Sequence, residues 1–345
     1  MNVSLRQRRI QSLTFIISYN YIGANVDNDK FYDIRGVFMA SIFGDQYFNS
    51  IGNYMKERFG CKVIKLSLDA GFTCPNRDGT KGIGGCIFCS ADGSGDFASN
   101  IPDQIRLLSK KWSSGKYITY FQSHTNTYAP VEVLREKYYQ ALEYPDVIGI
   151  AIATRPDCLS PEVLGLLSEL NQKTFLWIEL GLQTIHEDTA QLINRCYPLS
   201  DFDQAVDDLS RLQIKTVVHL ILGLPGESRE NMLASVRYVC SKNIFGIKLH
   251  LLNVLKDTKL AEFYPDRIHI PNKEEYINLV VDALEIIPQH ITIHRVTADA
   301  PRHLLIAPEW GYEKRSILNG ISKEFKRRDS YQGIKLESSN NTLET

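Results

Sequence analysis

The sequence lacks the features that mark several large classes of protein. It contains no apolar run of about 18 residues, so no segment is expected to cross a membrane and no membrane partner is expected. The apolar run at residues 13–17 is too short for the core of a secretory signal, and no small-residue cleavage site follows it. The formal net charge is only -1, so no global field draws the chain to nucleic acid or anionic lipid. These absences predict a cytoplasmic location.

An even set of regularly spaced cysteines is also missing. The chain has seven cysteines in 345 residues, an odd number in a chain too long to need a disulfide framework. Cys74, Cys86 and Cys89 lie within sixteen residues of one another, and the other four are scattered. This pattern favours a metal site together with ordinary thiols in a reducing compartment.

The two ends of the chain have little regular pattern. Residues 1–45 show no clear periodicity, and Met39 is available as an alternative start, so we expect an extension outside the core whose first 38 residues are dispensable. Residues 338–345 have the composition of a disordered tail.

From about residue 46 the sequence predicts an α/β fold with parallel strands. Short apolar runs alternate with helical stretches, some of which begin with clear caps, such as Ser160 before Pro161. A parallel sheet with right-handed crossovers follows, and a closed or partial barrel fits better than a dinucleotide-binding sheet, because no glycine fingerprint follows the first strand. One further helix, a short run at residues 291–295 and a polar C-terminal region come afterwards. The six expected strands are residues 63–68, 117–122, 147–153, 174–180, 216–222 and 246–252.

The three clustered cysteines follow the first expected strand. In a βα barrel the loops after the strands form the active site, so these thiols lie where chemistry is expected. Three thiolates suit an iron–sulfur cubane with one iron left open, whereas a closed zinc site needs four ligands. Two alternatives stay open: a four-cysteine zinc site that recruits Cys61, which precedes the strand, and a thiol redox pair at Cys86 and Cys89.

Several motifs together resemble one enzyme family. The loop Gly71-Phe-Thr-Cys-Pro-Asn-Arg-Asp-Gly-Thr closely resembles the signature of the YhcC-like radical S-adenosylmethionine (SAM) proteins, relatives of the elongator catalytic subunit. Matching segments follow in order at residues 120–128, 153–158, 179–183, 194–195, 219–227, 248–252 and 294–295. The resemblance covers roughly residues 46–335. It implies a partial (βα)6 barrel of the TIM type at residues 46–305, a short C-terminal extension at residues 306–337, and a [4Fe-4S] cluster on Cys74, Cys86 and Cys89.

The resemblance also implies that S-adenosyl-L-methionine binds the open iron and is cleaved reductively to a 5′-deoxyadenosyl radical. Phe88 would pack against adenine, the Gly223–Gly226 turn would meet the adenine edge, and Gln122 with Ser123 would bind the amino group of the cofactor. Glu179 and Gln183 would reach the ribose hydroxyls and the polar atoms of the methionine part. Arg195 would pair with its carboxylate through a planar fork.

One departure stands out: the family pattern has Gly-His after Asn194-Arg195, but this chain has Cys196 and Tyr197. The local geometry after Arg195 is therefore in question.

Substrate groups are less well defined by the sequence. Arg155, His250 and His294 are the candidate catalytic residues, and Asn126 and Tyr128 are further candidates for substrate contact, because all five follow strands toward the expected barrel mouth.

Three functional hypotheses belong to different classes. The first is tRNA nucleoside modification, with flavodoxin or ferredoxin as the reductant and a basic cluster at residues 323–328 as one RNA contact. The second is a small-molecule radical SAM enzyme. The third, a non-catalytic iron–sulfur electron carrier, leaves Arg195 and the polar residues of the fourth strand without a use.

Overall fold

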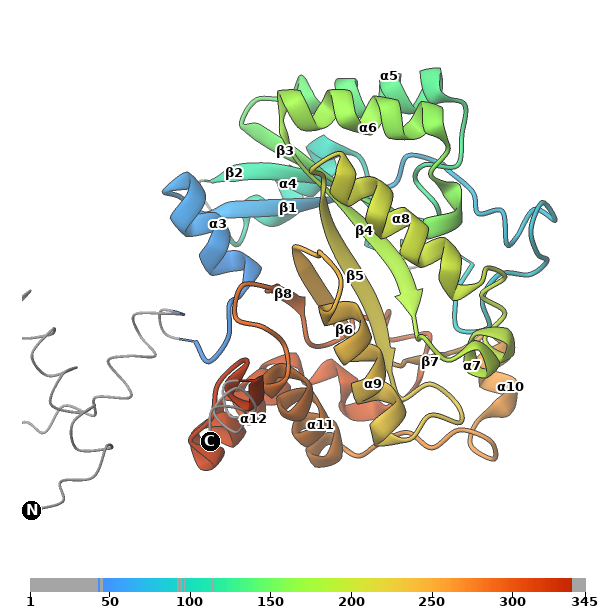
Figure 1. The fold of residues 1–345 in the computed structure, drawn as a ribbon, viewed down its shortest axis with the longest axis vertical. Coiled ribbons are helices and arrows are strands. Elements are labelled where there is room, and N and C mark those ends of the chain that lie inside the picture. Colours follow the sequence, from blue (N-terminus) through green and yellow to red (C-terminus); the bar gives the residue numbers. More distant parts are fainter. Residues whose placement is uncertain are drawn as a thin grey trace, which may run out of the picture.

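A parallel sheet curls through the centre of the molecule, and helices cover its outer face (Figure 1). The computed structural model describes residues 43, 46–91, 93, 95, 97–112 and 115–336. The strands are β1 (Val63–Leu68), β2 (Lys116–Phe121), β3 (Val147–Thr154), β4 (Phe175–Gln183), β5 (Lys215–Leu222), β6 (Gly246–Leu251), β7 (Val254–Leu255), β8 (Thr292–Arg295) and β9 (Leu305–Ala307). The α-helices are α3 (Ile51–Phe59), α4 (Ile101–Ser109), α5 (Val131–Leu142), α6 (Pro161–Lys173), α7 (Glu187–Leu192), α8 (Leu199–Arg211), α9 (Arg229–Cys240), α10 (Lys259–Phe263), α11 (Lys273–Glu285) and α12 (Lys314–Arg328). Short 3-10 helices lie at Pro156–Cys158 and Glu309–Tyr312.

The main sheet has seven parallel strands in the order β1-β2-β3-β4-β5-β6-β8. The expected α/β barrel with parallel strands is therefore confirmed, and the short run at residues 291–295 supplies a seventh strand, β8, which pairs with β6. Most of the strands are rich in buried apolar residues, as a sheet covered by helices requires, while β1, β5 and β6 also carry polar residues such as Lys65, His219 and Lys248. Because all seven strands are parallel, their carboxyl ends lie at the same end of the half-barrel, which is the open end.

Helix α3 closes the opposite end of the half-barrel. It contacts both edge strands, β1 and β8, and Met55 from this helix packs under the strands with Trp177 and Val217. Ser50 caps the helix by accepting a hydrogen bond from the Asn53 backbone N–H at 3.2 Å. The floor of the barrel is thus apolar and sealed, so polar groups inside it are reached only from the carboxyl end.

Phe43, a residue of the expected N-terminal extension, contacts the core. It is buried, and its carbonyl oxygen accepts a hydrogen bond from the Asn53 side chain at 2.7 Å. The dispensable segment at residues 1–38 and the tail at residues 338–345 lie outside the described residues.

The C-terminal region is built into the fold. Helix α12 packs along α11 (Figure 1), and β9 pairs antiparallel with β7. The buried amide of Gln332 donates to the carbonyls of Pro288 at 2.7 Å and Ile291 at 2.9 Å. Residues beyond 305 therefore complete the outer layer of the barrel. In the described part of the chain no helix is both long enough and apolar enough to span a membrane.

Candidate active site

The cysteine loop leaves β1 and crosses the open end of the half-barrel. Tight turns shape it: the N–H of Arg77 donates to the carbonyl of Cys74 at 2.8 Å, and the N–H of Cys89 donates to that of Cys86 at 3.0 Å. All three cysteines line one pocket of about 640 Å³ together with the ends of the strands. A volume of this size is ordinary for a cofactor or ligand site. Cys61 precedes β1 and belongs to the opposite end of the barrel, away from this pocket.

The thiols of Cys86 and Cys89 are hydrogen-bonded to each other. This bond lowers the pKa of Cys89, and the nearby Arg77 guanidinium lowers it further, although burial opposes both effects. The same bond, followed by burial, raises the pKa of Cys86. Arg155 lies close enough to Cys86 to act on it through its charge. Positive side chains around buried thiols favour thiolates, which are the form that binds iron.

The donor set fits a [4Fe-4S] cluster better than a single metal ion. Each thiolate of such a cluster binds a different iron, so the three sulfurs need not meet at one point. Within residues 46–91 and the rest of the described chain, no three His, Cys, Asp or Glu side chains converge as ligands of one ion do. Cys74, Cys86 and Cys89 would hold the cluster, and the pocket beside them would take SAM.

A segment after β4 holds the cysteine loop in place. The N–H of Ile87 donates to the carbonyl of Ile193 at 3.1 Å. The side-chain amide of Asn194 donates to the carbonyl of Gly85 at 2.8 Å, and its own backbone carbonyl accepts from the Asn76 side chain at 2.6 Å. Cys196 has a φ of 60°, in the left-handed region. The family pattern has glycine at this position, so the departure to cysteine keeps the turn and adds strain.

The Arg195 guanidinium is already saturated by the protein. It is 1% exposed, and it donates to the carbonyls of Thr184 at 2.6 Å and Tyr197 at 3.1 Å, and to the Glu187 carboxylate at 3.3 Å. The resemblance implied a pairing with the SAM carboxylate. Arg195 lines the pocket, but its N–H groups donate to these carbonyls and to Glu187, so it fixes the turn after β4; the pairing with the SAM carboxylate stays a prediction.

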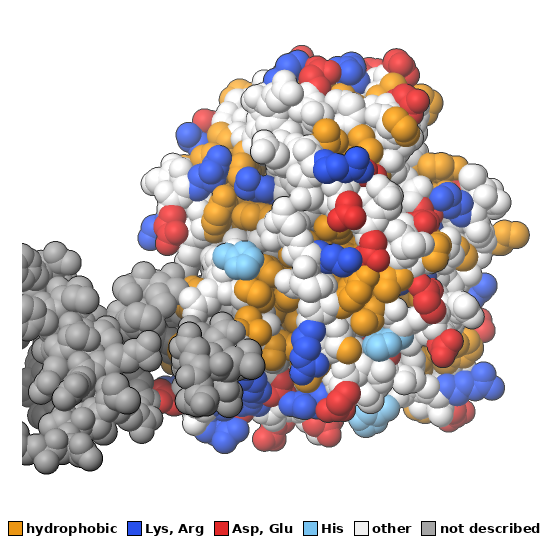
Figure 2. Space-filling model, viewed as in Figure 1, with side chains coloured by type: hydrophobic (Ala, Val, Ile, Leu, Met, Phe, Trp, Pro, Cys, Tyr) orange, Lys and Arg blue, Asp and Glu red, His pale blue; other side chains and the backbone are white. Residues whose placement is uncertain are grey.

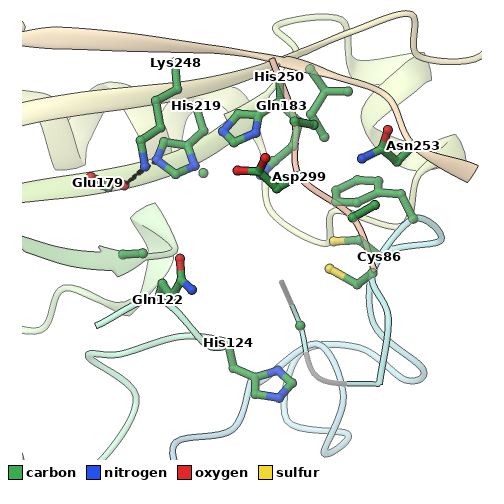
Figure 3. A pocket seen from close by; sticks show the side chains of 18 of the residues that line it. Cys86, Gln122, His124, Glu179, Gln183, His219, Lys248, His250, Asn253 and Asp299 are labelled. Atoms are coloured by element: carbon green, nitrogen blue, oxygen red, sulfur yellow. Dashed lines mark hydrogen bonds and ion pairs between the residues drawn. The ribbon is translucent and has the colours of Figure 1, made fainter. Parts of the chain in front are cut away.

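The Glu179 carboxylate is also occupied, within the barrel. It is fully buried; Oε1 accepts from Trp177 Nε1 at 2.9 Å and lies 3.5 Å from Lys65 Nζ, and Oε2 accepts from His219 Nε2 at 2.8 Å and from Lys248. Figure 3 shows Glu179, Lys248 and His219 grouped along adjacent strands. Both oxygens of Glu179 thus accept hydrogen bonds within the protein, although the residue lines the pocket together with His219 and Lys248. Its carboxylate neutralises the cations beside it, and the contact with ribose stays a prediction.

The electrostatics of this group follow from burial and from its neighbours. Burial alone would raise the pKa of Glu179, but Lys248 and Lys65 outweigh it and hold that pKa well below its usual range. Burial lowers the pKa of Lys248 well below its usual value despite Glu179. Burial, together with Lys248, lowers the pKa of His219 to about 4. His219 is therefore neutral at neutral pH.

The sequence motifs indicated no individual role for Lys65, Lys248 or His219. A signal was present, because polar residues at every second position of apolar strands, such as Lys248 and His250, mark a polar interior face. Glu179 and His219 face each other across the pair β4 and β5 for the same reason.

The candidate catalytic residues differ in what they face. His250 lines the pocket, its ring centroid lies 5.1 Å from that of His219, and its Nε2 has no hydrogen-bond partner among the described residues (Figure 3). Arg155 lines the pocket but is held by both oxygens of Asp157, at 2.9 Å each. His294 packs edge-on against Trp177 in the floor, with centroids 5.7 Å apart, and does not line the pocket. Of the three, His250 alone both lines the pocket and has a ring nitrogen there, Nε2, without a hydrogen-bond partner among the described residues.

The other expected cofactor residues are divided between the pocket and its surroundings. Phe88, Gln122 and Gln183 line it. Ser123 is buried without lining it, and its hydroxyl has no partner in the part of the chain that the structure describes. Gly223 and Gly226, with φ of 93° and 81°, form the turn after β5, behind the lining residues Ile221 and Leu252.

The two further substrate candidates lie away from the pocket. Asn126 is buried and donates to the carbonyl of Ala153 at 2.9 Å. The Tyr128 hydroxyl is 2.8 Å from that of Thr80, in a separate groove lined also by Pro156.

Comparisons with known proteins agree with this arrangement. A family model for the radical SAM superfamily matches residues 74–239, and one for the Radical_SAM C-terminal domain matches residues 244–327. The chain is 46% identical to YtqA of Bacillus subtilis over 298 residues, covering 84% of this chain and 92% of YtqA. It is 36% identical to YhcC of Escherichia coli K12 over 271 residues, covering 76% of this chain and 87% of YhcC.

More distant similarity extends to two further proteins. A tRNA uridine(34) acetyltransferase of Dehalococcoides mccartyi is 30% identical over 186 residues, which is 52% of this chain and 39% of that protein. The solved structure of Elp3 from the archaeon Methanocaldococcus infernus shares the fold with a TM-score of 0.59 and 17% identity, covering 78% of this chain and 64% of that one. Radical SAM enzymes use a [4Fe-4S] cluster and SAM, which is the cofactor pair that the three-cysteine pocket fits. The chain belongs to the radical SAM superfamily, within the group that contains YtqA and YhcC.

Proposed function

We propose that this radical SAM enzyme modifies a nucleoside in tRNA. The similarity of half of the chain to tRNA uridine(34) acetyltransferases carries the proposal. The pocket supports it, because it is open at the carboxyl end of the strands and lined there by groups suited to a polar ring, such as Gln122, Gln183 and the free nitrogen of His250. Bound together, the cluster and SAM supply a 5′-deoxyadenosyl radical that abstracts a hydrogen atom from the substrate.

The residues of the chain contribute binding, orientation and exclusion of water. Cys74, Cys86 and Cys89 hold the cluster at the mouth of the pocket, and Phe88 offers adenine an apolar surface. His250 is neutral at neutral pH, because burial lowers its pKa well below the usual value. It therefore acts as a hydrogen-bond partner of the substrate without carrying a charge. The sealed floor beneath it keeps bulk water away from the radical.

The basic cluster at residues 323–328 contributes less to RNA binding than its composition suggests. Arg328 pairs with Asp282 at 2.7 Å, and Arg327 pairs with Glu324 at 2.6 Å, which leaves Lys323 and Lys326 exposed. On the face shown in Figure 2, side chains of both signs are interspersed. This charge pattern favours the second candidate function, a small-molecule radical SAM enzyme, and any tRNA contact then depends on the rim of the pocket.

The electron that reduces the cluster would come from a small redox protein such as flavodoxin or ferredoxin. The seven free cysteines suit a reducing cytoplasm, where such carriers operate. We place the enzyme there.

The deciding experiment supplies bulk tRNA from a deletion strain to the reconstituted enzyme, with SAM and dithionite and without air. Formation of 5′-deoxyadenosine that depends on tRNA, with a new nucleoside seen by mass spectrometry of the digested tRNA, is the expected result. Cys86→Ala should abolish both products, whereas Cys61→Ala, at the other end of β1, should retain them. Cleavage of SAM that is indifferent to tRNA, with nucleoside profiles identical between deletion strain and parent, would favour the small-molecule alternative.

A further inference from the structure

Asn76 contacts a cluster ligand from a fully buried position in the cysteine loop. Its side chain is 0% exposed, and Nδ2 lies 3.5 Å from Cys86 Sγ and 2.6 Å from the carbonyl oxygen of Asn194. The orientation of the amide is fixed by chemistry, since both neighbours of this nitrogen are acceptors once Cys86 is a thiolate. The amide oxygen has no partner in the described part of the chain.

The surrounding backbone prevents this amide from turning away. A Cβ on Gly82 would lie 2.0 Å from Asn76 Oδ1, so the loop backbone packs directly on the oxygen side of the amide. On the nitrogen side, Asn194 holds the loop through its bond to the Gly85 carbonyl at 2.8 Å. Asn76 therefore cannot exchange the sulfur for water without moving the loop.

Two cations near the cysteines, Arg77 and Arg155, do not bond to the Cys86 sulfur. The Arg77 guanidinium donates to the carbonyls of Ala91, at 3.1 Å, and Ser90, and it also hydrogen-bonds the Cys89 thiol. Arg155 is held by Asp157. Their charges act on the thiols, but Asn76 aims a neutral N–H directly at the Cys86 sulfur. Hydrogen bonds to cluster sulfurs set reduction potentials, because the added electron increases the charge on the sulfurs and a donor stabilises the reduced form more.

We propose that Asn76 is a positioning residue that donates a hydrogen bond to the Cys86 thiolate of the bound cluster and raises its reduction potential. The electron from the reductant then enters the cluster more easily. This role rests on the cofactor of the superfamily and not on the identity of the substrate, so it stands or falls separately from the tRNA proposal.

The test is the midpoint potential of the reconstituted cluster, measured by anaerobic titration followed by electron paramagnetic resonance (EPR). In Asn76→Ala the equilibrium constant for reduction should fall about tenfold, which for one electron is a shift of about 59 mV to more negative potential. Asn126→Ala is the matched control, because Asn126 is also 0% exposed but donates to the carbonyl of Ala153 and not to a thiol. Iron and sulfide contents near four per chain would show that each variant holds a complete cluster. An unchanged potential in a fully loaded Asn76→Ala protein would overturn the proposal.

A second measurement applies even if that variant fails to take up iron. Wild-type protein is labelled with 15N only in asparagine, and its reduced cluster is studied by pulsed EPR without SAM. A coupled asparagine nitrogen, together with an exchangeable deuteron in D2O, is the expected signature of the N–H···S contact. A spectrum without either coupling would overturn the proposal whatever the variant does.

Discussion

Replacing the buried Glu179 by glutamine tests the charge group beneath the pocket. The carboxylate is 0% exposed, and it faces Lys248, whose side chain is 3% exposed, as well as Lys65 and His219. Removing one partner of a buried ion pair leaves the other uncompensated and typically costs about 3–5 kcal/mol. For a chain of this size each kcal/mol shifts the melting temperature by about 2 °C, so Glu179→Gln should melt about 6–10 °C lower.

A double-mutant cycle separates this electrostatic cost from a general packing defect. Lys248→Met removes the facing cation with a side chain of similar length. The double variant should be more stable than the sum of the single effects by about 2 kcal/mol, because it removes both charges of the Glu179–Lys248 pair and leaves only the partly exposed Lys65 without Glu179.

The assay is thermal unfolding of the cluster-loaded proteins, followed by circular dichroism without air, with SAM affinity measured in parallel. Because both Glu179 oxygens already accept hydrogen bonds within the protein, the SAM dissociation constant of Glu179→Gln should stay within about threefold of the wild type, a change of less than about 1 kcal/mol. Strictly additive stability effects would refute the ion-pair reasoning. A loss of SAM affinity of about a hundredfold with unchanged stability would return Glu179 to the cofactor site.

Three further predictions concern separate parts of the fold. Arg328→Ala should cost about 2 kcal/mol, because it removes charge-assisted hydrogen bonds from the buried Asp282 and Glu285 of α11, which keep Arg229 and Lys335 as partners, whereas the exposed Lys326→Ala should change unfolding by less than about 0.5 kcal/mol in urea titrations. Gly82→Ala should reduce iron uptake several-fold by colorimetric assay, since its Cβ has no room, but Gly165→Ala has open space and should load normally. The free energy of unfolding should fall as the pH drops from about 6.5 toward 4. In this range the unfolded chain binds a proton at residue 219, whereas folded His219, with its pKa of about 4, stays unprotonated. His219→Asn should reduce that slope in pH-dependent unfolding without abolishing it, because burial also lowers the pKa values of His250 and His294 well below the usual value; an unchanged slope would contradict the assignment.

The sequence determined the features that depend on local spacing. The strand-like runs and capped helices predicted the parallel α/β barrel, because burial on both faces demands continuous apolar strands. The motif around Cys74, Cys86 and Cys89 predicted the superfamily that the family model matches. The seventh strand corresponds to the short run at residues 291–295, although no local feature of the sequence predicted that this run would join the sheet.

The tertiary structure decided which polar groups meet. Glu179 on β4 is paired with Lys65 on β1 and Lys248 on β6, residues 114 and 69 positions away along the chain. Asn76 reaches the carbonyl of Asn194 across 118 positions. Sequence motifs place such residues near a site. The curvature and register of the sheet then decide which group forms a hydrogen bond with each buried donor or acceptor. For that reason the motifs placed Arg195 and Glu179 at the pocket but did not show which groups of the protein they bind.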